Sequence, residues 1–98
     1  MITLSEKQIQ KLIPASSSSV SKMVVGDWFV LQRQEEYNIY EIKKIKYKNI
    51  NEKKLIVLLH NITLGNIVED VNLYNVIFKE RYVYYNSFIK KINKIMQL

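Results

Sequence analysis

The sequence contains no cysteine, and its 98 residues include only two glycines and one proline. The absence of cysteine excludes disulfides, thiolate nucleophiles and thiolate metal sites. The two glycines, Gly26 and Gly65, stand far apart and cannot form a glycine-rich phosphate-binding loop, which excludes nucleotide hydrolysis of the common type. No apolar run approaches the roughly 18 residues of a membrane-spanning helix, and the first residues lack a secretory signal pattern. We therefore expect one cytoplasmic globular protein.

Side chains that commonly carry out catalysis are also scarce. The single histidine, His60, ends an apolar segment without a second histidine or a nearby carboxylate, which favours a structural role over metal binding. Glu35 and Glu36 fall in a predicted hairpin turn, where an exposed acidic pair is ordinary. The serines of residues 17–19 have no base held near them. The sequence predicts a protein that is not an enzyme, with no catalytic residue, no metal site and no cofactor.

The residues that are abundant indicate a folded protein from an AT-rich genome. Hydrophobic residues make up 48% of the chain and charged residues 24%, which is typical of a single globular unit. Isoleucine, lysine, asparagine, tyrosine and phenylalanine, whose codons are AT-rich, fill 46 positions. This bias suggests a low-GC bacterium, its phages or another mobile element. It also weakens the lysine excess as evidence for nucleic-acid binding, because the chain has only two arginines.

The first 22 residues are predicted to form a short helix and a tether. Ser5 followed by Gln8 forms a capping box, and Pro14 ends the apolar helical spacing, so residues 1–14 are predicted to hold an N-terminal helix. Residues 15–22 are rich in serine and are predicted to be a flexible linker. A phosphorylated or partner-ordered segment is the alternative, and an ordinary linker is favoured. Residues 23–98 are predicted to form one β-rich domain.

Five strands are predicted within this domain. Residues 24–31 and 37–47 are rich in β-branched and aromatic residues and are separated by a polar break, which is typical of a hairpin. The apolar alternation of the second strand changes register at Lys43 and Lys44, which predicts a bulge or a sharp bend. Residues 55–59 are apolar on both faces, a strand follows Gly65, and residues 76–85 are predicted to be the last strand or strand pair.

The last residues are predicted to form an amphipathic helix that packs on the sheet. Asn86 or Ser87 can cap its N-terminus. At helical spacing, five apolar residues fall within an arc of about 120°. These residues are Phe88, Ile89, Ile92, Ile95 and Met96. The sequence thus predicts a mainly β fold, with a five-stranded bent antiparallel sheet, a short N-terminal helix and a C-terminal amphipathic helix.

The pattern from residue 24 to residue 80 resembles small SH3-like barrels. The resemblance is carried by Val25-Gly26-Asp27-Trp28-Phe29-Val30, by the bent second strand, by residues 55–59 and by the strand after Gly65. It implies a closed or nearly closed β-sheet. Barrels of this type serve as RNA-, DNA- or peptide-binding modules in many unrelated systems, so the resemblance implies a fold more than a function.

One enzymatic family with an SH3-like barrel, the toxin endoribonucleases, begins with a similar Gly-Asp-plus-apolar strand. In that family an arginine shortly downstream and a later serine or threonine carry out the cleavage. Here the corresponding second strand has only lysines, and the nearest arginine, Arg33, lies in the first hairpin. This departure argues against endoribonuclease activity.

The formal net charge of +6 is concentrated in two segments. Residues 41–54 contain six lysines and two glutamates, and residues 79–98 contain five basic residues and one acid, so each segment carries +4. Residues 1–40 are neutral overall, and residues 60–78 carry −2. If the last helix packs beside the second hairpin, the two segments form one basic face.

Such a face would neutralise phosphates and release counterions, while exposed aromatic rings would stack on unpaired bases. The residues predicted to contact phosphate are Lys43, Lys44, Lys46, Lys48, Lys90, Lys91 and Lys94. The predicted stacking side chains are Tyr40, Tyr47 and Trp28. Alternatively, the lysines keep a small protein soluble and the tyrosines fill the rim of the barrel. The sequence leaves both interpretations open.

These observations predict a non-catalytic binding module. The expected role is a small phage or mobile-element regulator or inhibitor that engages nucleic acid or a host nucleoprotein complex through a basic face. The alternative is a subunit of a homo- or hetero-oligomer that uses a sheet edge or the apolar stripe of the last helix. Neither a membrane partner nor a small-molecule substrate is indicated.

Overall fold

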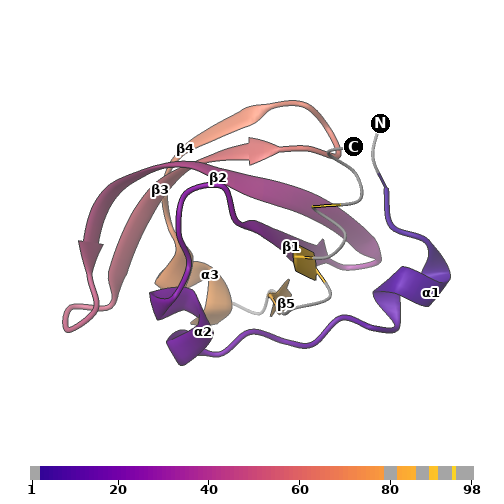
Figure 1. Ribbon diagram of the computed structural model, residues 1–98, viewed down its shortest axis with the longest axis horizontal. Coiled ribbons are helices and arrows are strands. Elements are labelled where there is room, and N and C mark those ends of the chain that lie inside the picture. Colours follow the sequence, from indigo (N-terminus) through magenta and orange to yellow (C-terminus); the bar gives the residue numbers. More distant parts are fainter. Residues whose placement is uncertain (1–2, 79–81, 86–88, 91–93, 95–98) are drawn as a thin grey trace.

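A computed structural model gives the fold, and it describes residues 3–78, 82–85, 89–90 and 94. Five antiparallel strands form one sheet in the order β4-β3-β2-β1-β5, which confirms the predicted mainly β fold (Figure 1). The strands are β1 (Trp28–Arg33), β2 (Glu36–Asn49), β3 (Lys54–Asn61), β4 (Ile67–Asn72) and β5 (Tyr82–Tyr84). The helices are α1 (Glu6–Ile9), α2 (Ser17–Ser21) and α3 (Leu73–Phe78). Within the described residues, no helix is long and apolar enough to span a bilayer.

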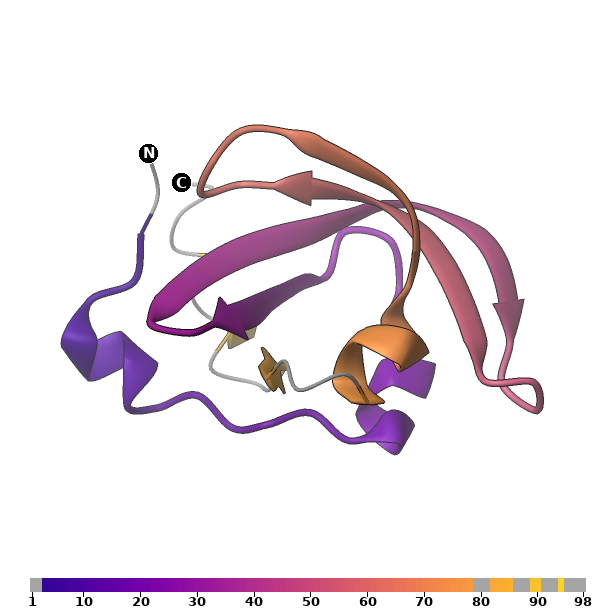
Figure 2. The same cartoon turned by 180° about the vertical axis from the view of Figure 1, so that it is seen from behind.

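Strand β2 is long and bends, and β3 follows its curve. The ladder between β2 and β3 shifts register between Ile42 and Lys44, which confirms the bulge predicted at the paired lysines. A second shift lies between Ile45 and Tyr47. Because each extra residue increases the local twist, two shifts in one strand curl the sheet over its concave face (Figure 2). The outer strands β4 and β5 do not pair with each other in the described part of the chain.

Both faces of the sheet are packed around β1. On the concave face, Phe29 and Leu31 join buried residues from β2, β3, α2 and α3 in the larger core. On the convex face, Trp28 and Val30 pack with Ile39 and Ile89 in a smaller second core. The first four residues of β1 are all apolar because this strand is covered on both faces.

The N-terminal segment is more ordered than the sequence indicated. The capping box of Ser5 and Gln8 is present, but α1 covers only Glu6–Ile9 of the predicted residues 1–14. The serine-rich segment, expected to be a flexible tether, contains α2, which begins at a second capping box formed by Ser16 and Ser19. Val20 and Met23 are fully buried in the larger core, and this burial explains why the segment is held in place.

The last strand was predicted to begin at residue 76, but it begins at Tyr82. Val76, Ile77 and Phe78 lie in α3, and the strand β5 covers only Tyr82–Tyr84. The helix begins directly after β4, where the side chain of Asn72 accepts a hydrogen bond from the backbone N–H of Tyr74 at 3.2 Å. Of the predicted C-terminal helix, the structure describes Ile89, Lys90 and Lys94, all with helical backbone, and its other residues lie outside the described part.

Candidate nucleic-acid interface

The hairpin between β2 and β3 carries the largest group of lysines in the described chain. We call residues 43–54 the hairpin surface. Its six lysines are all exposed: Lys43, Lys44, Lys46, Lys48, Lys53 and Lys54. The first four were predicted from the sequence to contact phosphate, and the last two belong to the same surface because the turn folds them back beside β2. A group of exposed cations on one hairpin is suited to neutralise the negative charges of a polyanion.

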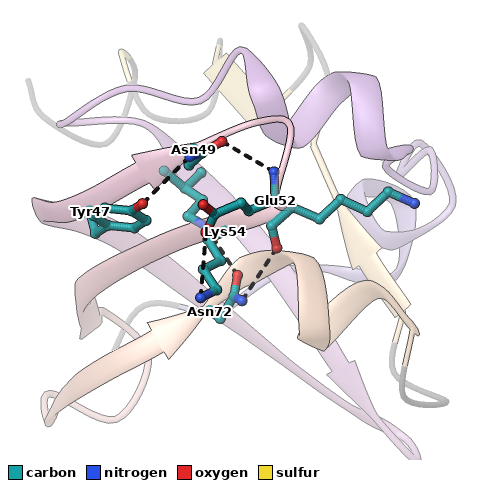
Figure 3. A network of polar contacts seen from close by, with 7 residues as sticks. Tyr47, Asn49, Glu52, Lys54 and Asn72 are labelled. Carbon is teal, nitrogen blue, oxygen red and sulfur yellow. Dashed lines mark hydrogen bonds and ion pairs between the residues drawn. The ribbon is translucent and has the colours of Figure 1, made fainter.

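Local backbone contacts fix the shape of this hairpin. The backbone N–H of Lys53 donates to the carbonyl of Ile50 at 3.0 Å, and the side chain of Asn49 accepts from the N–H of Glu52 at 3.1 Å. Asn72 then joins the hairpin to β4, since it accepts from the N–H of Leu55 at 3.1 Å and donates to the carbonyl of Lys53 at 3.4 Å (Figure 3). The lysines therefore project from a braced turn.

Ion pairs divide the lysines into two groups. Lys43 lies 2.6 Å from Glu41, Lys46 lies 2.9 Å from Asp70, and Lys54 lies 3.5 Å from Glu52. The hydrogen bond to Asp70 raises the pKa of Lys46 above its ordinary value. Lys44 and Lys48 make no ion pair within the described residues. These two are the lysines whose charge the protein does not already compensate.

Glu41 connects the start of the surface to the convex core. Its carboxylate accepts a hydrogen bond from the indole N–H of Trp28 at 3.2 Å and pairs with Lys43. Partial burial by itself would raise the pKa of Glu41. The hydrogen bonds from Lys43 and Trp28, together with the charges of Lys43 and His60, outweigh burial and hold that pKa below its ordinary value. The carboxylate is therefore anionic at neutral pH, and it competes with phosphate for Lys43.

The three predicted stacking residues occupy different environments. Tyr47 is 45% exposed and lies between Lys46 and Lys48 in the sequence of β2. Trp28 is only 5% exposed in the convex core. Tyr40 is half-buried, and its ring stacks on Phe29 with the centroids 5.5 Å apart. The geometry leaves Tyr47 as the one predicted aromatic side chain that can meet a base, because the other two are engaged inside the protein.

The described C-terminal residues do not extend the hairpin surface. Ile89 is 1% exposed and packs near Ile62, which follows β3, whereas the hairpin turn precedes β3. An eight-residue strand separates these positions by roughly 25 Å. Lys90 lies over the ring of Tyr85, with its amine 5.3 Å from the centroid. Lys94 is exposed, and Lys91 lies outside the described residues.

The alternative interface on the last helix is described at one position. Ile89 is buried against β1 and β2, so it packs on its own sheet. Four predicted members of the stripe lie outside the described residues: Phe88, Ile92, Ile95 and Met96. The structure instead exposes apolar side chains that the sequence did not single out, on the convex face of β3 and β4. Ile67 of β4 is 53% exposed and lies opposite His60, while Ile56 and Leu58 of β3 are half-buried.

The groups considered for catalysis remain apart. His60 is half-buried and lies opposite Glu41 in the sheet. Arg33 is exposed at the end of β1, and Arg81 lies outside the described residues. In the part of the chain that the structure describes, no group of three or more histidine, cysteine, aspartate or glutamate side chains is arranged to hold a metal ion.

No protein-family model matches the chain, no curated protein matches its sequence significantly, and no solved structure matches its fold significantly. Function must therefore be inferred from the exposure, charge and geometry of the described side chains.

Proposed function

We propose that the protein is a non-catalytic binding module that engages single-stranded nucleic acid, alone or within a nucleoprotein complex, through the hairpin surface. One observation carries this proposal: six exposed lysines and the exposed ring of Tyr47 lie on one braced hairpin. The small size and AT-rich composition fit a phage or mobile-element regulator or inhibitor that acts by occlusion.

The physical basis is the pairing of charge with an accessible aromatic ring. Lys44 and Lys48 contribute charge that no described carboxylate offsets, and each phosphate they neutralise releases counterions. Tyr47 can stack on a base only if that base is unpaired, which favours single strands over a duplex. Lys43 and Lys46 would have to exchange a carboxylate for a phosphate, so their contribution is smaller.

We further propose that the domain is an SH3-like barrel. The strand order places β5 beside β1, and the two register shifts bend β2 strongly, as a small five-stranded barrel requires. Closure of the barrel would bring β4, at one edge of the sheet, towards β5 at the other edge, with α3 connecting the two strands.

The test of the nucleic-acid proposal is a fluorescence-anisotropy titration of single-stranded RNA, single-stranded DNA and duplex DNA at two salt concentrations. The double variant Lys44→Gln/Lys48→Gln should weaken single-strand binding and reduce the salt slope by about 1.4, because two phosphate contacts are lost at about 0.7 each. Tyr47→Ala should weaken binding further without changing the slope.

The matched control is Lys7→Gln/Lys22→Gln, which removes the same net charge from exposed positions in the N-terminal segment. This control should leave affinity nearly unchanged. Equal losses in both double variants, or no binding of any polymer at low salt, would contradict a site on the hairpin.

Protein association is the second candidate, and the exposed apolar convex face favours it. Ile67 and Tyr47 are both exposed there, and β4 is an edge strand with no described partner on its outer side. Light scattering over a range of concentrations distinguishes the two candidates. A dimer that is disrupted by Ile67→Lys and unaffected by the lysine variants would favour association.

A further inference from the structure

A cavity of about 260 Å³ lies within the curl of the sheet, on the concave side between β1 and β4. Its walls are apolar and come from strands that are far apart in the sheet order. The main apolar lining residues are Phe29, Tyr40, Leu59, Val68, Val71 and Leu73. An apolar space of this size is suited to an apolar group.

Three side chains with N–H donors interrupt the apolar lining: Arg33, Asn61 and Asn66. Arg33 lines the cavity and is exposed, so it stands at the mouth, and it makes no ion pair with a described carboxylate. Asn61 is 2% exposed and lies in the wall. Its side-chain oxygen accepts from the N–H of Leu64 at 3.0 Å, and its Nδ2 has no acceptor among the described residues. An oxygen of a ligand in the cavity would accept a hydrogen bond from this amide.

No acidic side chain lines the cavity. Arg33 is the one charged residue among those that line the cavity, with Glu36 opposite it in the β1–β2 ladder. Arginine is the side chain best suited to hold a carboxylate through two parallel hydrogen bonds. The apolar walls favour a hydrocarbon tail. These features together define a ligand with one apolar end and one anionic end.

We propose that this cavity binds a small organic carboxylate whose apolar tail fills the space between β1 and β4 and whose carboxylate contacts Arg33. Asn61 Nδ2 is a second donor along the wall. A cavity of 150 Å³ accommodates benzene, so about ten non-hydrogen atoms fit here. A ligand of that size binds with a Kd between about 10 μM and 1 mM. This site is independent of the hairpin surface.

The test is a methyl NMR titration with octanoate, using octanamide as an uncharged probe of nearly the same shape. Octanoate should shift the methyl signals of Leu59, Val68 and Val71, whereas the methyls of Val30 and Ile39 in the convex core should not move. Octanamide should bind at least about fivefold more weakly, because it lacks the charge that pairs with Arg33.

Variants of the protein test the contact to the carboxylate and the contact to the apolar tail separately. Arg33→Gln should abolish the preference for octanoate over octanamide and leave octanamide binding unchanged, whereas Lys54→Gln should preserve the preference. Val68→Phe should fill the cavity and eliminate binding of both probes. No shift of the cavity methyls at 5 mM octanoate, about five times the weakest Kd expected, would overturn the proposal. Equal affinity of the intact protein for both probes would also overturn it.

Discussion

Two tyrosines show how differently a buried phenol can be accommodated. The hydroxyl of Tyr74 is fully buried in the larger core and has no hydrogen-bond partner among the described residues. The hydroxyl of Tyr85 donates to the carboxylate of Asp27 at 2.7 Å. Burial, and then the hydrogen bond and charge of Asp27, raise the pKa of Tyr85 well above its ordinary value. Tyr85 therefore remains protonated and a donor at neutral pH, whereas burial has removed water from the Tyr74 hydroxyl without supplying a described partner.

The difference between Tyr74 and Tyr85 predicts opposite effects on stability when each hydroxyl is removed. Tyr74→Phe should leave the free energy of unfolding unchanged or raise it by about 1 kcal/mol, because the unsatisfied hydroxyl is removed. Tyr85→Phe should lower it by about 1–2 kcal/mol, because the Asp27 carboxylate loses a donor. Urea unfolding of both variants provides the measurement. A larger loss for Tyr74→Phe than for Tyr85→Phe would mean that the Tyr74 hydroxyl has a partner.

At the scale of the elements, Asn72 connects three of them. It ends β4, caps the start of α3 through the N–H of Tyr74, and accepts from the N–H of Leu55 in β3. The same side chain reaches the turn of the β2–β3 hairpin through Lys53 (Figure 3). One amide thus sets both the start of a helix and the position of the hairpin surface.

Asn72→Ala should destabilise the protein by about 1–3 kcal/mol, since two backbone donors lose their acceptor. Asn72→Asp keeps both acceptor contacts and loses only the 3.4 Å contact to Lys53, so it should cost less than half as much. Thermal unfolding measures the difference, and hydrogen exchange at the Leu55 amide reports it locally. Equal destabilisation by the two variants would show that the acceptor oxygen is not the important group.

At the level of single elements, some features of the fold were predictable from the sequence and others were not. The bulge at Lys43 and Lys44 was predictable because a strand with one buried face records a register shift in its apolar alternation. The assignment of residues 76–78 to a strand failed because β-branched residues favour strands locally, while a side chain four residues earlier caps a helix. The predicted stacking by Trp28 overlooked that four consecutive apolar residues imply burial on both faces.

At the scale of the whole molecule, the N-terminal segment is part of the globule. Val20 and Met23 close the concave core beside α3, in a stretch whose serines gave no sign of it. Composition alone cannot distinguish a tether from a helix that is held by two buried side chains. Whether such a segment is ordered depends on the tertiary structure, that is, on which surface its apolar side chains pack against.

Val20→Ala should therefore lower the free energy of unfolding by about 2 kcal/mol, from the two lost methyl groups and the cavity they leave. Ser17→Ala, on the exposed side of the same helix, should change it by less than about 0.5 kcal/mol. Chemical denaturation compares the two variants. If residues 15–22 were a free tether, both substitutions would be neutral.

The contact between the N-terminal segment and β5 limits how the protein can polymerise. Pro14 forms a bridge with Tyr84, and the N–H of Ala15 donates to the carbonyl of Val83 at 2.6 Å. That side of the sheet is thus already occupied, and proline offers no N–H to an incoming strand. Among the described strands, two segments can still accept a neighbour: β4, whose backbone is interrupted at Asp70 (φ 54°), and residues 44–49 of β2, which extend beyond the ladder with β1. The N-terminal segment thus protects the β5 edge from strand addition, and within the described chain it confines such addition to these two segments.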